Sequence, residues 1–148
     1  MSLQDWQARG WIEAHQTSAD EITRLLRIAD RDLKQSEIAG LSADWKLNIA
    51  YNAALQAATA ALAAAGFRPR DHYYAIESLR FTIGAVPRIV TPLDRLRKKR
   101  NLNAYEQEGS TSDQEAKEAL VIARQLCRAV KEWLAQAHPQ LLQDAPEF

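Results

Sequence analysis

The feature that most constrains the fold is an uncharged, alanine-rich stretch of 21 residues from Leu47 to Phe67. Ten of these residues are alanine, which has the highest helix propensity of all residues. The stretch is long enough to span a membrane, but it contains only four large aliphatic residues together with two asparagines, a glutamine and a threonine. We therefore interpret it as the central, buried helix of a helical bundle, and we expect no association with a membrane.

Glycine and proline residues divide the rest of the chain into further segments with helical periodicity. Ser18 and Ser112 each begin a capping-box pattern, and Thr91 followed by Pro92 predicts a helix that starts with proline in its first turn. The expected helices cover residues 18–37, 43–65, 71–84, 91–106 and 112–137, with one more short turn within residues 6–15. Because the connections are short, we predict an all-α protein, a four- to five-helix up-down bundle. It would form a single domain over residues 1–148, with its core at about residues 18–137.

Composition narrows the class of protein further. The chain has 148 residues and one cysteine, Cys127, which excludes an internal disulfide framework and is expected to be buried in the core. The N-terminus lacks the basic and apolar regions of a secretory signal, so we expect a cytoplasmic protein. Glycine-rich phosphate loops, nucleophile elbows and histidine-based metal motifs are absent from the sequence. We therefore predict neither a metal nor a cofactor.

The formal net charge is zero, but the charges are segregated along the chain. Residues 88–100 contain six basic side chains and one acidic one, whereas residues 106–118 contain five acidic side chains and one basic one. Overall neutrality argues against a broadly basic nucleic-acid binder, but it is compatible with one local phosphate-binding patch. The alternative is that the basic run forms a solvated helix face opposite the acidic residues that follow it.

Arg100 is the most unusual of these basic residues. At 100° per residue it falls on the same helix face as Leu93 and Leu96, in the middle of an apolar surface. An arginine on such a face is costly unless it is paired or borders a cleft or a subunit interface. Two interpretations remain open: an ion pair within the chain, for instance with Glu77 or Asp94, or a phosphate-facing arginine at a dimer seam.

Three segments together resemble the HEPN superfamily. Residues 100–106 read Arg-Asn-Leu-Asn-Ala-Tyr-Glu, late on the fourth expected long helix of an alanine-rich bundle. The preceding helices carry residues 48–54, Asn-Ile-Ala-Tyr-Asn-Ala-Ala, and residues 72–74, His-Tyr-Tyr. The similarity covers roughly residues 18–137, and the order of the helices contributes more to it than the short motif does.

This resemblance implies a small helical bundle that dimerises and acts on RNA without a metal ion. Active members carry an arginine, then a polar residue, then a histidine four to six positions beyond. Arg100 matches the arginine that would hold the scissile phosphate, and Asn101 matches the polar residue. Tyr105 stands where the histidine is expected. A phenol with a pKa near 10 is a poor base at neutral pH, and loss of a general base typically costs about 10²–10⁴-fold in rate.

Two hypotheses follow from the resemblance. The first is a HEPN-like homodimer that binds RNA or a nucleotide in a composite groove lined by Arg100 and Asn101, with Arg97, Lys98 and Lys99 attracting phosphates. It would be a metal-independent endoribonuclease or a toxin–antitoxin component with a degenerate motif, Tyr105 replacing the histidine. The second is a catalytically inactive helical protein for dimerisation or interaction, with an antitoxin or a nucleotidyltransferase as a candidate partner. A DNA-binding regulator is less favoured, because no tight helix-turn-helix is evident.

Overall fold

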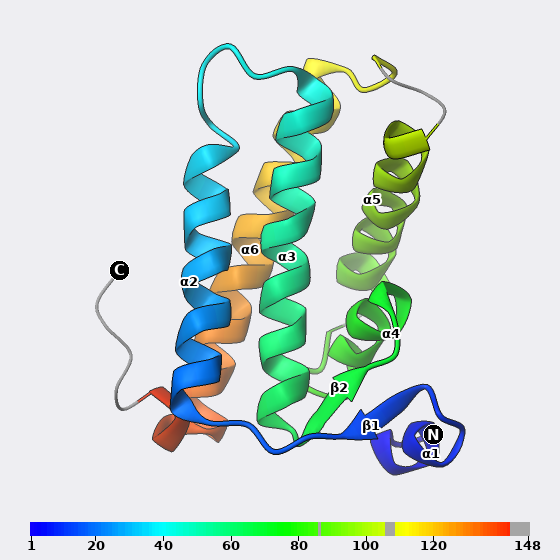
Figure 1. Ribbon diagram of the computed structural model, residues 1–148, viewed down its shortest axis with the longest axis vertical. Helices are drawn as coiled ribbons and strands as arrows, with labels where there is room; N and C mark the ends of the chain where they lie inside the picture. The colour runs from blue at the N-terminus through cyan, green and yellow to red at the C-terminus, as the bar shows by residue number, and fades with distance from the viewer. Residues whose placement is uncertain (86, 106–108, 143–148) are drawn as a thin grey trace.

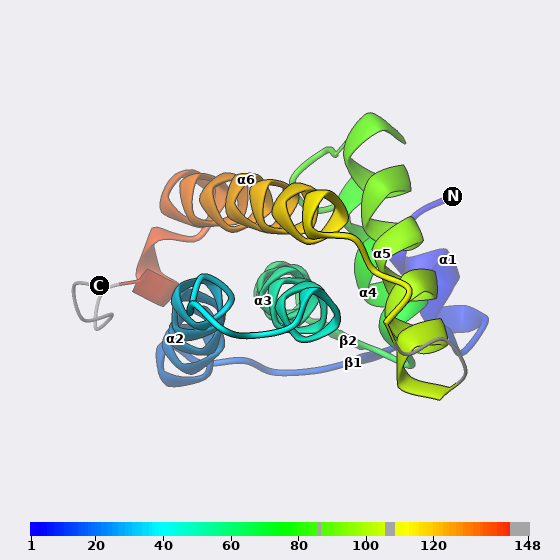
Figure 2. The ribbon, with the colours of Figure 1, turned by 90° about the horizontal axis from the view of Figure 1, so that it is seen from above.

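The computed structural model describes residues 1–85, 87–105 and 109–142, with the backbone alone for residues 101–105. Its long helices are α2 (Ala19–Gln35), α3 (Ala43–Ala64), α5 (Pro87–Tyr105) and α6 (Asp113–Ala137). They run alternately up and down, as the sequence predicts for a bundle (Figure 1). Viewed from above, α3 lies between α2, α6 and α5 (Figure 2). None of the described helices is long and apolar enough to cross a membrane.

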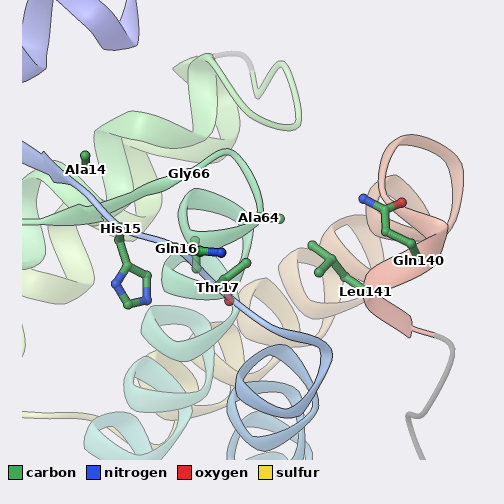
Figure 3. Close-up of a pocket in the computed structure, with 9 residues that line it drawn as sticks. Ala14, His15, Gln16, Thr17, Ala64, Gly66, Gln140 and Leu141 are labelled. Carbon is green, nitrogen blue, oxygen red and sulfur yellow. The ribbon is translucent and has the colours of Figure 1, made fainter.

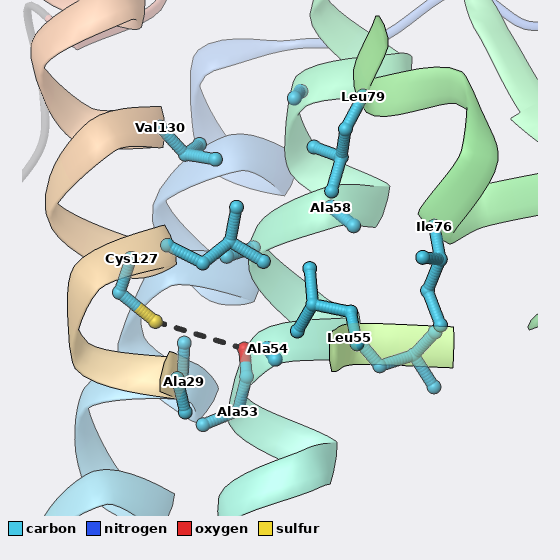
Figure 4. Close-up of a cluster of buried hydrophobic side chains, with 14 of the residues drawn as sticks. Ala29, Ala53, Ala54, Leu55, Ala58, Ile76, Leu79, Cys127 and Val130 are labelled. Carbon is cyan, nitrogen blue, oxygen red and sulfur yellow. Dashed lines mark hydrogen bonds between the residues drawn. The ribbon is translucent and has the colours of Figure 1, made fainter. Parts of the chain in front are cut away.

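Helix α3 forms the centre of the hydrophobic core, as its composition predicts. Ala50, Ala53 and Ala58 are fully inaccessible to solvent, although at 100° per residue they lie on different faces of the helix. Small side chains on every face allow the neighbouring helices to approach the α3 backbone closely. The Cys127 thiol of α6 lies 3.8 Å from the carbonyl oxygen of Ala53, toward which it donates a weak hydrogen bond (Figure 4). Cys127 is therefore the buried residue that the sequence predicts.

Two polar side chains of α3, Asn52 and Gln56, form a hydrogen-bond network with α2. The amide nitrogen of Asn52 donates a hydrogen bond of 2.6 Å to the buried carboxylate of Asp32. Gln56 donates in turn to the side-chain oxygen of Asn52 at 3.3 Å. This network satisfies groups that would be expensive to bury alone.

The N-terminal segment differs from the expected single turn. Residues Leu3–Ala8 form helix α1, and Ile12–Ala14 form strand β1, which pairs antiparallel with strand β2 (Phe67–Pro69). An all-α fold is thus correct for most of the chain, but it misses this small sheet. Each strand has three residues, which is too short to show the alternation by which strands are recognised in a sequence.

An aromatic cluster anchors this segment beneath the bundle. The ring of Trp6 lies 5.5 Å from Tyr74 and 5.1 Å from Phe81, both in edge-to-face geometry. Trp11 stacks on Tyr74 at 5.2 Å. Tyr74 belongs to helix α4 (His72–Glu77), so residues 6–11 pack directly against that helix.

Two expected helix boundaries are wrong. The helix predicted over residues 71–84 is only the six-residue α4, followed by a 3₁₀ turn over Ser78–Arg80. Helix α5 begins at Pro87 rather than at residue 91, so Pro92 lies inside it. Proline is favoured at the first position of a helix, and Pro87 occupies that position after Gly84, whose φ of +72° ends the preceding turn. Pro92 follows a capping residue in the same way, which is why the sequence predicts the start of the helix at residue 91.

The last helix begins where its sequence predicts. Ser112 caps α6: its hydroxyl accepts from the Glu115 backbone N–H at 3.0 Å, while the Glu115 carboxylate accepts from the Ser112 backbone N–H at 3.0 Å. This is the reciprocal capping box. A short 3₁₀ turn (Pro139–Leu142) follows α6.

Candidate functional site

Helix α5 carries Arg100 on the face that the helical wheel predicts. Leu93 is fully buried and Leu96 is 9% exposed, and both pack in the main core. Arg100 continues this face one turn later and is half-buried. The side chain of Arg100 therefore lies at the end of the apolar face of α5, the helix that packs against both α3 and α4 (Figure 1).

The acidic partners considered for Arg100 are engaged elsewhere. Glu77 pairs with Arg80 at 3.0 Å, and Asp94 pairs with Arg97 at 2.9 Å. Within the described part of the chain, Arg100 forms no ion pair. The interpretation of Arg100 as a member of an intrachain pair with Glu77 or Asp94 is thus wrong, which leaves a partly buried cation to be explained by something outside the described chain.

Tyr51 and His72 lie on the same side of the bundle. Tyr51 is in α3 and is 1% exposed, and its hydroxyl oxygen lies 3.4 Å from Nδ1 of His72. His72 is the first residue of α4, where the side chain of Asp71 caps the helix by accepting from the backbone N–H of Tyr74 at 3.3 Å. The cap fixes where α4 begins, and so where the imidazole meets the buried phenol. His72 is exposed to solvent on one side, while the other side of its ring is shielded by Tyr51, with ring centroids 6.1 Å apart.

Arg100 acts electrostatically on both of these groups. Partial burial lowers the pKa of His72, the positive charges of Arg100 and Arg97 lower it further, and the negative charge of Asp71 opposes them. Burial raises the pKa of Tyr51 to about 12, against the opposing effect of the same two arginines. At neutral pH the imidazole and the phenol are therefore both uncharged, and the arginines give this region a positive potential. Such a potential favours an anionic ligand.

An exposed aromatic ring extends this region. Tyr73 is 40% exposed, and the guanidinium carbon of Arg97 lies 5.4 Å from its ring centroid, a cation–π geometry. Arg97 thus contacts Asp94 and Tyr73 at the same time. The combination places a ring able to stack with a planar ligand beside the Arg97 guanidinium.

The two predicted phosphate-binding lysines occupy different surroundings. Lys98 is 67% exposed on its side chain and lies 3.3 Å from Asp94. The ammonium of Lys99 donates to the carbonyl oxygen of Ser110 at 3.1 Å and lies 3.7 Å from Glu115. Lys99 therefore contacts the chain that leads into α6. The charges of Arg97 and Arg100 thus act on Tyr51 and His72, whereas Lys99 is engaged by Ser110 and Glu115.

The two remaining predicted site residues, Asn101 and Tyr105, belong to the last turn of α5. Their side chains lie outside the described residues. Over the described ranges, no group of three or more histidine, cysteine or acidic residues is arranged to hold a metal ion.

Sequence reasoning did not identify Tyr51 or His72 as site residues. Twenty-one positions separate them, and only the packing of α4 against α3 brings them together. One signal was available in the sequence: Tyr51 is the single hydroxyl-bearing aromatic residue in the alanine-rich, uncharged stretch of residues 47–67.

A hollow of about 550 Å³ lies in another part of the molecule, where the chain passes from β1 into α2 (Figure 3). His15 and Thr17 line it, with Gln140 and Leu141 among the other lining residues. The side chains of His15 and Thr17 are already engaged, because the Glu21 carboxylate accepts from the Thr17 hydroxyl at 2.6 Å and lies 2.7 Å from Nε2 of His15. No arginine or lysine is among its described lining residues, so it is a weaker candidate for an anionic ligand.

We compared the chain with curated proteins, with solved structures and with models of protein families. No curated protein and no solved structure gives a match to the chain. A family model described as the HEPN domain matches residues 22–133, a range that runs from α2 to α6 and includes Tyr51, His72 and Arg100. This match covers more than half of the 148 residues, and the chain belongs to the HEPN domain family.

Proposed function

We propose that this HEPN domain protein binds RNA through Arg100 and cleaves it without a metal ion. The observation that carries the proposal is that Arg100 is half-buried with no ion pair in the described chain, while its charge acts to lower the pKa of both Tyr51 and His72. A partly buried guanidinium without a carboxylate partner retains donors to fill, and the oxygens of a phosphate match its fork as those of a carboxylate do.

The neighbouring side chains support RNA as the source of that phosphate. Tyr73 offers an exposed ring within 5.4 Å of the Arg97 guanidinium, and aromatic rings beside basic groups are typical of sites for single-stranded nucleic acids. Lys98 is exposed on the same helix and adds to the attraction of the RNA backbone. Asn101, the next residue after Arg100, would complete the contacts to the phosphate.

The proposed site is composite, as in other members of the superfamily. Two copies of the chain would meet so that both Arg100 side chains face one groove. A half-buried arginine at the border of an apolar face is suited to such a seam, because the partner covers the apolar residues while the RNA neutralises the charge. Sedimentation of the protein with and without RNA would test the dimer.

The function can be tested by RNA binding and cleavage with matched variants. A fluorescently labelled single-stranded RNA is titrated with the wild-type chain, with Arg100→Ala and with Arg124→Ala, all in EDTA. Arg124 is an arginine of α6, outside the site, that pairs with Glu37. Loss of a charge-assisted hydrogen bond costs about 1.5–3 kcal/mol, so we expect Arg100→Ala to weaken binding by about 10–100-fold.

The Arg124→Ala variant should bind within about twofold of the wild type, because its contribution is a single exposed charge. Cleavage should persist in EDTA and disappear in Arg100→Ala. Equal binding and cleavage by Arg100→Ala and the wild type would refute the proposed site.

A second candidate function is a catalytically inactive interaction protein, and one observation favours it. Tyr105 occupies the position of the motif histidine, and a phenol is a poor base at neutral pH. In this case the α5 face would serve only for dimerisation or for a partner such as an antitoxin or a nucleotidyltransferase. Cleavage that survives EDTA and depends on Arg100 would exclude this alternative.

A further inference from the structure

A ribonuclease of this type needs a group that takes a proton at neutral pH, and histidine is the side chain best suited to it. The chain contains three histidines: His15, His72 and His138. His15 is held against Glu21 at 2.7 Å, and His138 packs against Trp133 at the end of α6, with ring centroids 5.0 Å apart. His72 instead lies 3.4 Å from the Tyr51 hydroxyl, and its neighbour in the chain, Tyr73, packs against the Arg97 guanidinium of α5.

We infer that His72 is the general base of this site and takes over the role for which position 105 offers only a tyrosine. The inference rests on the proposed function. It places the base on α4, one helix earlier in the chain than the arginine motif, so that the site is assembled from α3, α4 and α5 rather than from α5 alone.

The contact with Tyr51 orients the imidazole for this task. Tyr51 is 1% exposed, so its hydroxyl is a fixed point at the edge of the core. When Nδ1 of His72 carries the proton and donates it to the tyrosine oxygen, the lone pair of Nε2 is free. No other hydrogen bond to the His72 ring is present among the described residues, and the residue is exposed. Nε2 is then available to a substrate, and Tyr51 is a positioning residue.

The charges around His72 suit a base rather than an acid. Arg97 and Arg100 face it from α5, Asp71 precedes it in the chain, and Tyr51 is a neutral phenol below it. The two positive charges and the partial burial outweigh the single carboxylate, so the pKa of the imidazole lies below its ordinary value. The ring is therefore mostly uncharged at pH 7 and able to accept a proton.

The proposed step is a transesterification within the RNA. Nε2 of His72 takes the proton of a ribose 2′-hydroxyl while the 2′-oxygen forms a bond to the adjacent phosphorus. The bond between phosphorus and the 5′-oxygen of the next nucleotide breaks, and that oxygen takes a proton from water. The products are a 2′,3′-cyclic phosphate and a 5′-hydroxyl end. The imidazolium returns its proton to the hydroxide left in solution, and Arg100 stabilises the extra negative charge on the phosphorane oxygens.

The test separates proton transfer from RNA binding. Cleavage rate and RNA affinity are measured in EDTA for the wild type, His72→Gln, His72→Ala, Arg100→Ala and the matched control His138→Gln. Circular dichroism and thermal melting check that each variant is folded. We expect His72→Gln to lower the cleavage rate by about 10²–10⁴-fold while its RNA affinity stays within about threefold of the wild type. Added imidazole should restore part of the activity of His72→Ala, and His138→Gln should cleave like the wild type.

The Tyr51→Phe variant tests the positioning role. Without the hydroxyl, the protonated imidazole loses the hydrogen bond from Nδ1, so the acidic limb of the pH–rate profile should move to lower pH. A purely structural role for Tyr51 would lower activity equally at every pH.

The outcomes distinguish the inference from the function on which it rests. If Arg100→Ala abolishes cleavage but His72→Gln cleaves within threefold of the wild type, the base is wrong and the proposed function stands. If His138→Gln falls as far as His72→Gln, the assignment to His72 is also overturned. If the wild type binds RNA in an Arg100-dependent manner but cleaves none, the base and the ribonuclease activity are both refuted.

Discussion

The position of α5 determines where Arg100 lies, and Leu93→Ala tests what holds that helix in place. Leu93 is fully buried in the main core, two turns before Arg100. The substitution removes three carbons, worth about 0.8 kcal/mol each in transfer free energy, or about 2.4 kcal/mol in total. A penalty for the cavity that remains is added to this value.

The neighbouring space sets the size of that penalty. A hollow of about 320 Å³ lies between α5 and α6, lined in part by Pro92 and Leu96. Side chains beside an existing hollow can move into new space more easily than side chains in a fully packed region. We therefore expect a total loss of about 3 kcal/mol, in the lower half of the usual range of about 2–5 kcal/mol. For a chain of this length, the melting temperature should fall by about 6–12 °C.

Urea unfolding monitored by circular dichroism measures this loss, with Val121→Ala as the control. Val121 is on α6 and is 51% exposed, so its truncation should change the free energy of unfolding by less than about 0.5 kcal/mol. A loss below 1 kcal/mol for Leu93→Ala, or one equal to that of the control, would refute the packing of α5 described above. RNA affinity should fall in parallel if Arg100 depends on this packing.

Three further predictions concern single groups. Arg100→Gln should raise the pKa of His72, because the positive charge that disfavours the imidazolium is removed. An NMR titration of the imidazole measures this pKa, and an unchanged value would mean that the two side chains do not interact. Cys127 should resist thiol reagents in the folded protein, since it is buried and burial raises its pKa to about 12. Rapid labelling of the folded protein would contradict the burial of Cys127 in the core. Asn52→Ala should lower the free energy of unfolding by about 2 kcal/mol, because the buried Asp32 carboxylate loses the amide donor at 2.6 Å. Denaturant unfolding measures this loss, and a value below about 0.5 kcal/mol would show that water replaces the amide.

The long helices could be predicted because their signals are local. Ser18 and Ser112 each place a hydroxyl three residues before a backbone N–H that needs an acceptor, and both caps are formed as expected. The apolar, alanine-rich composition of residues 47–67 similarly requires burial on all sides, and α3 is central. Such patterns can be recognised in a sequence because the residues that interact lie within one or two helical turns of each other.

The parts that escaped prediction depend on contacts between distant residues. Pairing of Glu13 with Arg68 in the small sheet joins positions 55 residues apart, and its strands have no pattern of their own. The contact between Tyr51 and His72 likewise exists only because α4 packs on α3. Arg100 itself could be recognised as anomalous, but whether an acid neutralises it depends on the competing pairs of Glu77 and Asp94.

The small sheet at the base of the bundle has a consequence for where the protein can be shortened. The family match begins at residue 22, after both α1 and β1. A fragment cut at that boundary would keep Arg100, Tyr51 and His72 in its sequence. It would lose the partner of β2 and the Trp6 and Trp11 rings that pack against Tyr74, two residues from His72. The smallest unit that preserves the site geometry therefore extends beyond the region that defines the family, and the first fifteen residues belong to it.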